Sequence, residues 1–114
     1  MRKIKGNTLC VIQIKNIEVN NIGESVNRWN DCLKFNGILG LQSGDSKYSN
    51  FNAKIEESTH VLICNYDEKI YSLADHNTRV KIKDKIYDIL LIDNPDELNE
   101  QLELYLRYIG GQNG

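Results

Sequence analysis

Residues 79–111, RVKIKDKIYDILLIDNPDELNEQLELYLRYIGG, carry the signals that decide the fold. Val80 and Ile82 alternate with charged residues, as in a half-buried strand. After a short polar break, a second apolar segment runs from Ile86 to Asp93. This pattern predicts an antiparallel hairpin that turns in the region of Lys83–Asp84, although the favoured Asn-Gly pair is missing.

The end of this stretch, residues 94–109, is ambiguous between helix and strand. Asn94 and Pro95 fit the start of a helix, Gly110 fits its end, and the leucines between them follow a 3.6-residue period. The leucines of residues 102–108 also alternate strictly with Glu, Tyr and Arg, which is the period of a strand. Local rules alone favour the helix.

The segments upstream also indicate strands. Thr8–Val19 is rich in β-branched residues at period two, so it predicts a strand or a bulged pair of strands. Lys54–Tyr66 ends apolar on both faces, which is typical of a strand near the centre of a sheet. Residues 43–52 are almost wholly polar, and we expect a long flexible loop at residues 39–52 and a flexible tail at residues 110–114.

Length and composition limit the class of protein. The chain has 114 residues, 40% of them apolar and 26% charged, which fits one globular domain. No apolar run approaches the eighteen or so residues that span a bilayer, so we expect no membrane association. The formal net charge of −2 argues against a dedicated nucleic-acid binder, which normally carries a basic surface.

The residues that could perform chemistry are few and isolated. Cys10, Cys32 and Cys64 form no Cys-x-x-Cys pair, so we expect free thiols in a reducing compartment. His60 and His76 have no partner at metal-binding spacing, and neither a nucleophile elbow nor a phosphate-binding loop is present. We therefore predict no catalytic residue, no metal site and no cofactor.

Three stretches together resemble one known family. They are NRWNDCLKFNGILGLQSGDS at residues 27–46, ESTHVLICNY at residues 57–66, and the closing stretch at residues 80–111. They resemble the head–tail joining proteins of long-tailed phages and of prophages in low-GC Gram-positive bacteria, over residues 26–111. The chain departs from the pattern where Lys-Asp-Lys replaces the Asn-Gly turn and where Asp-Asn-Pro replaces Asp-Asp-Pro.

The resemblance implies a mainly β fold. It predicts a single domain over residues 1–114, a small β-barrel or sandwich of five to seven antiparallel strands with a long polar loop and at most one short helix. A turn or short helical turn then occupies residues 95–99, and a strand replaces the locally favoured helix at residues 100–109. We expect most of the core to come from Trp29, Ile89, Leu91, Leu102, Leu104 and Leu106.

The resemblance also implies a structural role and no enzyme activity. Such head-closure, or stopper, proteins form a dodecameric ring below the portal and adaptor rings, retain the packaged DNA and offer a docking surface for the tail. The protein would belong to the virion, would be assembled in the cytoplasm of the bacterial host, and could be monomeric when isolated. It would meet DNA in the channel without sequence specificity. The family projects a loop into that channel, which here implies a gating segment made of Gly44, Asp45, Ser46, Lys47 and Tyr48.

The charge distribution suggests where subunits could meet. Residues 79–85 are mainly basic and residues 93–103 are wholly acidic among their charged members. Opposite charges of this kind can steer association and fix the register of two subunits. The interface candidates are Arg79, Lys81, Lys83, Asp96, Glu97 and Glu100.

Two other functions remain open at this point. The chain could be an SH3-like or OB-like barrel that binds a protein partner outside any virion, or a joining protein on the tail side of the connector.

Overall fold

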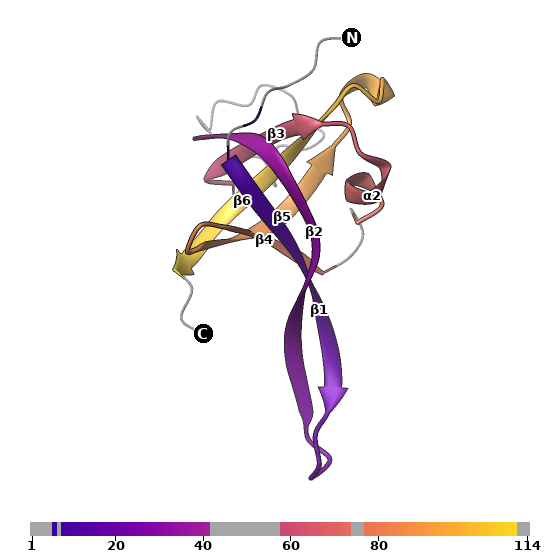
Figure 1. Ribbon diagram of the computed structural model, residues 1–114, viewed down its shortest axis with the longest axis vertical. Helices are drawn as coiled ribbons and strands as arrows, with labels where there is room; N and C mark the ends of the chain where they lie inside the picture. Colours follow the sequence, from indigo (N-terminus) through magenta and orange to yellow (C-terminus); the bar gives the residue numbers. More distant parts are fainter. Residues whose placement is uncertain (1–5, 7, 42–57, 74–76, 112–114) are drawn as a thin grey trace.

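The computed structural model describes residues 6, 8–41, 58–73 and 77–111, in which six antiparallel strands form one sheet that closes into a barrel (Figure 1). The strand order around the barrel is β1-β2-β3-β6-β5-β4. The predicted mainly β fold is therefore confirmed. In chain order the elements are β1 (Thr8–Val19), β2 (Ser25–Leu41), β3 (His60–Asn65), the helical turn α2 (Glu68–Tyr71), β4 (Thr78–Ile82), β5 (Lys85–Asp93), the 3-10 turn η1 (Pro95–Glu97) and β6 (Gln101–Gly111).

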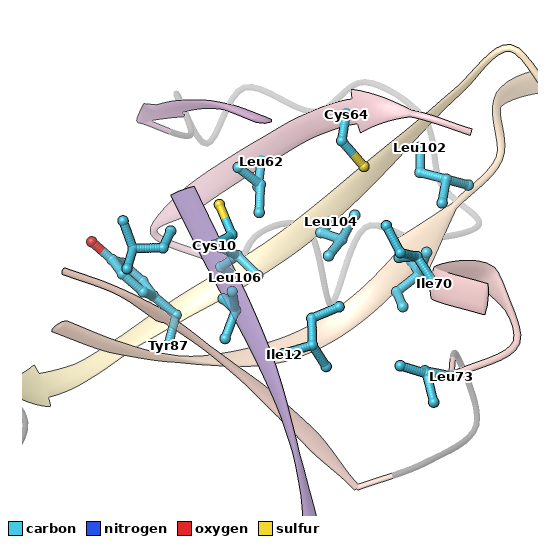
Figure 2. Packing of buried hydrophobic residues seen from close by; sticks show 13 residues of the cluster. Cys10, Ile12, Leu62, Cys64, Ile70, Leu73, Tyr87, Leu102, Leu104 and Leu106 are labelled. Atoms are coloured by element: carbon cyan, nitrogen blue, oxygen red, sulfur yellow. The ribbon is translucent and has the colours of Figure 1, made fainter. Parts of the chain in front are cut away.

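The core inside the barrel is built from side chains of β1, β3, β4, β5 and β6 and of the helical turn α2 (Figure 2), and partly buried side chains of β2 pack against it. Leu104 on β6 lies between two cross-strand neighbours, Leu62 on β3 and Ile92 on β5, and all three are buried. The buried cluster consists of Cys10, Ile12, Leu62, Cys64, Ile70, Leu73, Val80, Ile82, Tyr87, Ile92, Leu102, Leu104 and Leu106.

Tertiary pairing decides the segment that local rules left ambiguous. Residues 101–111 form β6, which pairs with β3 on one side and β5 on the other. A strand buries Leu102, Leu104 and Leu106 completely on one face, and its two ladders satisfy the backbone on both sides. The turn predicted at residues 95–99 is also present, as η1.

Two predicted boundaries and two predicted core positions need correction, the second of these positions being Leu91. β2 continues to Leu41, so residues 39–41 belong to a strand, and residues 42–52 of the predicted loop lie outside the described residues. β6 continues to Gly111, so residues 110 and 111 of the predicted tail are also in a strand, and residues 112–114 lie outside the described residues. Trp29 is half-buried and does not belong to the core cluster, because its stretch of β2 pairs with β1 beyond the end of the barrel.

The remaining predicted core residues divide by strand face. Leu102, Leu104 and Leu106 are in the cluster, and Ile89 packs against it. Leu91 is only half-buried, because an irregularity between Ile89 and Leu91 places Leu91 opposite Tyr105 on the outer face.

The β1–β2 hairpin extends well beyond the barrel and forms an arm, residues 15–30 (Figure 1). β4 pairs with β1 only as far as Ile14, so the arm has no third strand among the described residues. The molecule measures 51 × 27 × 25 Å, and its radius of gyration of 15.0 Å exceeds the roughly 13 Å of a compact chain of this length. At the tip, the Asn20 side chain accepts hydrogen bonds from the backbone of Ile22 and Glu24.

The end of the barrel opposite the β4–β5 turn is covered by α2 (Figures 1 and 2). Asp67 caps this helical turn by accepting a hydrogen bond from the Lys69 amide, and the turn places Ile70 and Leu73 in the core. At Gly37 the chain passes so close to β3 that an added Cβ would lie 2.9 Å from Leu62 Cδ1. None of the helices in the described ranges is long and apolar enough to cross a bilayer.

Candidate functional site

The predicted gating segment, Gly44, Asp45, Ser46, Lys47 and Tyr48, lies outside the described residues. Its role stays a prediction. The predicted interface residues, by contrast, all lie in the described part of the chain, on the barrel surface.

The basic candidates lie on β4 and in the turn that follows it. Arg79 is held in place, because its Nε donates to Gln13 Oε1 at 2.7 Å and its guanidinium lies 4.2 Å from the centre of the Trp29 ring. Burial lowers the pKa of Arg79, and nearby Asp88 opposes that shift. Lys83 occupies the β4–β5 turn with a left-handed backbone, φ 58°, and its side chain is exposed.

Lys81 and Lys83 border an open groove of about 600 Å³ on the outer face of β1 and β4. Lys81 lies directly opposite Val11 in the β1–β4 ladder, so the lysine flanks an apolar strip on β1. Leu9, the other apolar residue of the strip, is 58% exposed. Thr8 and Asp31 complete the lining. The groove thus combines apolar side chains with two cationic ones, and sequence reasoning found the lysines but missed the apolar strip.

The acidic candidates Asp96 and Glu97 lie in the β5–β6 turn and are exposed. Both have left-handed backbones, with φ of 53° and 54°, and Asn99 in the same turn has φ 58°. Asn94 is buried under this turn and holds its shape with two hydrogen bonds. Its side chain accepts a hydrogen bond from the Asn99 amide at 3.1 Å and donates one to Asn99 Oδ1 at 2.7 Å. A left-handed backbone costs a residue with a Cβ about 1–2 kcal/mol, so the turn keeps this shape at the expense of strain.

Two further residues complete the acidic turn. Leu98, which lies between Glu97 and Asn99, is 61% exposed. Glu100 has an exposed side chain, and its backbone carbonyl accepts from the Tyr66 amide at 3.2 Å, which fixes the end of the turn against the chain that follows β3.

The β4–β5 turn, which contains Lys83, and the acidic turn lie at opposite ends of β5 (Figure 1), whereas Arg79 lies on β4 opposite Asp88 in the middle of β5. β5 starts after Lys83 and Asp84 and ends at Asp93, just before η1. Its nine residues at about 3.3 Å each separate the two turns by roughly 30 Å. The basic and acidic sets therefore cannot neutralise one another within one chain, and no ion pair joins them in the described ranges.

The arm exposes an apolar face that sequence reasoning did not identify. Ile17 and Val19 are each 70% exposed and, being two residues apart, lie on the same face of β1. Ile22 at the tip is 79% exposed. On the opposite face, Glu18 and Arg28 form an ion pair at 2.8 Å. The β-branched pattern predicted this strand, but only the structure places it beyond the barrel, where these side chains remain uncovered.

A polar ladder crosses the outer face of the barrel. Gln13 Nε2 donates to Asp31 at 2.8 Å, Arg79 donates to Gln13, and Arg79 lies opposite Asp88 in the β4–β5 register. Asp88 in turn pairs with Arg107 at 3.1 Å. The sequence shows these residues as alternating polar positions, but their adjacency depends on registers between strands far apart in the chain.

The titratable groups inside the barrel show no catalytic arrangement. Burial raises the pKa of the Cys10 thiol to about 11, and burial, followed by the neighbouring Cys10 and Asp67, raises the pKa of the Cys64 thiol to about 12. Both thiols therefore stay protonated and unreactive near neutral pH. Cys32 is free and exposed at the outer surface. The part of the chain that the structure describes contains no group of three His, Cys, Asp or Glu residues that could hold a metal ion.

His60 belongs to an aromatic cluster at one end of the barrel. Its ring packs against Tyr87 at 5.0 Å, and Tyr87 packs against Tyr108 at 5.5 Å. Burial, and then the charge of Lys85, lower the pKa of His60. His60 Nδ1 lies 2.8 Å from Thr59 Oγ1, so the ring has a structural partner. His76 lies outside the described residues.

Comparison with known proteins supports the fold alone. No protein-family model matches the chain, and no curated protein matches it. Among solved structures, the chain is similar to the solution structure of protein SF1141 from Shigella flexneri 2a, with a TM-score of 0.67 and 18% sequence identity. The similarity covers 95% of this chain and 96% of that protein, so the two share the whole domain architecture.

Proposed function

We propose that this protein is a structural virion protein that closes the DNA-filled head of a long-tailed phage below the portal and adaptor rings and offers the surface to which the tail attaches. The resemblance of residues 26–111 to head–tail joining proteins suggests this role. Its partners would be the portal or adaptor protein, the tail proteins and further copies of itself, with packaged DNA passing through the channel.

The observation that carries the proposal is the arm. A barrel that works alone has no need of a hairpin that leaves the core, and the apolar side chains of Ile17, Val19 and Ile22 remain exposed on it. Exposed apolar surface of this kind marks sites of association. An arm that reaches beyond its own domain is well suited to contact a neighbouring subunit or an adjacent ring.

The dimensions of the molecule favour a ring. With lateral extents of 27 and 25 Å and an interior filled by side chains, one subunit cannot enclose a DNA-sized channel. Contacts between different surfaces of identical subunits generate closed rings when the rotation closes. The separated basic and acidic turns provide two such surfaces, and we propose a dodecamer, as in the family that the sequence resembles.

The electrostatic character also agrees with a DNA channel. The chain has a net charge of −2, so a ring of many copies carries a net negative charge. Few phosphate contacts then slow the passage of DNA, because cationic side chains are what bind the DNA backbone. We place the gating role on the segment from Gly44 to Tyr48, as the resemblance implies.

The alternative of a separate interaction module rests on the unpaired edge of β2. Among the described parts of the chain, residues 25–37 of β2 pair with β1 only, since β3 pairs with β2 from Ile38 onward. An open edge of this kind can accept a strand from another protein. Such a module would bind a peptide as a monomer and would not bind to phage heads.

The test uses DNA-filled heads made by a phage that lacks this gene. Addition of the purified protein should protect the packaged DNA from nuclease and allow tails to join. The variant Ile17→Asn with Val19→Asn should fold but fail to bind the heads, whereas Glu18→Gln on the opposite face of the arm should act like the wild type. Heads that keep their DNA and accept tails without the protein would refute the proposed function.

A further inference from the structure

We propose that the groove bordered by Lys81 and Lys83 binds the turn of residues 95–100 from a second copy of this chain, with Leu98 inserted against the apolar strip of β1. This contact would join subunits head to tail. It deepens the proposed function, because it specifies how a closure ring is held together.

The groove has the composition of a site for an apolar side chain with acidic neighbours. Leu9 and Val11 offer apolar surface at its base, and Lys81 and Lys83 border it. Asp31 also lines the groove, but its carboxylate accepts a hydrogen bond from Gln13, and the two lysines leave the groove with a net positive charge. A groove of about 600 Å³ has ample room for a leucine side chain and its flanking turn.

The turn has the complementary composition. Leu98, 61% exposed, follows Asp96 and Glu97 in the sequence and precedes Glu100 by two residues, so the turn carries three carboxylates close to one exposed leucine. The two hydrogen bonds between Asn94 and Asn99 keep the turn in one conformation before binding. A preformed turn loses little conformational freedom on binding, which favours association.

The positions of the two surfaces determine the kind of contact. The groove is lined in part by Lys83 of the β4–β5 turn. The acidic turn lies at the other end of β5 (Figure 1), and the nine residues of β5 separate the two turns by roughly 30 Å. A chain therefore cannot place its own turn in its own groove. Each copy offers one groove and one turn, so the contact is heterologous, and it forms a ring when the rotation between successive copies closes.

DNA is a poorer occupant of the groove than a second copy. A sugar–phosphate backbone would satisfy Lys81 and Lys83 but would leave Leu9 and Val11 against a charged polymer. The acidic turn, by contrast, supplies a leucine together with its charges.

Disulfide trapping between two variants tests the contact directly. All chains carry Cys32→Ser to remove the exposed native thiol. One chain also carries Lys83→Cys and the other Glu97→Cys, and the two are mixed under mild oxidation at high protein concentration. We expect a mixed disulfide at a yield about tenfold above that of the control, the ratio that a contact of about 1.4 kcal/mol produces.

The control pair uses a cysteine of equal exposure that the proposal does not involve. Glu68→Cys, on the exposed side of α2, replaces Glu97→Cys in the mixture with Lys83→Cys. Equal yields from the two pairs would overturn the proposal. Circular dichroism of each variant should match the wild type, since all of these side chains are exposed.

Three substitutions then separate specific docking from general attraction. Leu98→Ala on the turn chain should lower the yield, and Lys81→Glu on the groove chain should lower it further at low salt. Glu100→Lys on the turn chain should restore part of the yield against Lys81→Glu. An unchanged yield with Leu98→Ala would contradict insertion of the leucine.

The results also separate this contact from the proposed function. If the chains cross-link as predicted but the protein neither binds DNA-filled heads nor retains their DNA, the proposed contact is supported and the proposed head-closure role is refuted. If the protein closes heads but the trapped pair forms no better than the control, the function stands and this contact is wrong.

Discussion

Replacement of Leu104 by Ala tests the barrel at its centre. Leu104 is fully buried on β6, between Leu62 of β3 and Ile92 of β5, and hydrogen-bonded ladders hold all three strands. A closed barrel cannot easily contract around the missing atoms. Leucine-to-alanine substitutions in cores cost about 2–5 kcal/mol, and we expect a value of about 3–4 kcal/mol here because the site is rigid.

Urea unfolding followed by far-UV circular dichroism measures this loss. With a slope of about 1.5 kcal/mol per molar urea, a loss of about 3 kcal/mol lowers the midpoint by about 2 M. Trp29 fluorescence provides a second probe from the edge of the arm, and its transition should coincide with that of the dichroism if the domain unfolds in one step.

The matched control is Leu98→Ala, which removes the same atoms from a side chain that is 61% exposed. Its effect on stability should stay within about 0.5 kcal/mol. A loss below about 0.5 kcal/mol for Leu104→Ala would refute the assignment of strand faces, because a slip of one residue exchanges the core side and the solvent side.

Three other perturbations follow from the same structure. Gly37→Ala should destabilise the protein by about 1–3 kcal/mol in urea unfolding, since the new methyl group would lie 2.9 Å from Leu62 Cδ1, and no loss would contradict this close approach. Asp93 lies directly opposite Glu103, and burial, followed by the charge of Glu103, raises the pKa of Asp93. Ionised Asp93 therefore destabilises the folded protein at neutral pH, and this destabilisation is lost as the pH falls through the raised pKa of Asp93. Asp93→Asn should therefore stabilise the protein at neutral pH by about 0.2–1 kcal/mol and lose this advantage in acid; an equal gain at both pH values would exclude the like-charge explanation. Alkylation of the folded protein should modify Cys32 alone and reach the two buried cysteines only after unfolding, whereas fast reaction of all three would contradict the buried core.

Much of the fold could be predicted from periodicity, and the parts that could not depend on contacts distant in sequence. The alternation around Val80 and Ile82 correctly indicated a strand, because one face of β4 is buried. The segment at residues 101–111 follows both a helical and a strand period, with local rules in favour of the helix, and only pairing with both β3 and β5 makes it a strand. The hairpin turn lies at Lys83–Asp84, since Ile82 pairs with Lys85.

For the candidate site, too, the sequence predicts the surface residues but not their arrangement, which depends on contacts distant in sequence. Charge counts were enough to identify Lys81, Lys83, Asp96 and Glu97 as surface candidates, because long charged side chains rarely lie inside a core. The separation of the two sets along β5 required the topology. Arg79 belongs to a different structure, the stack on Trp29, which arises from the register of β1 with β2 and β4 and cannot be read from one segment alone.

The most direct test of the proposed function is cryo-electron microscopy of the portal vertex from DNA-filled heads incubated with this protein. The account predicts a ring of these barrels below the adaptor, with the β4–β5 turn of each subunit against the acidic turn of the next and the arms in contact with a neighbouring subunit or ring. A vertex without the protein, or with single barrels that make no contact with one another, would contradict the account.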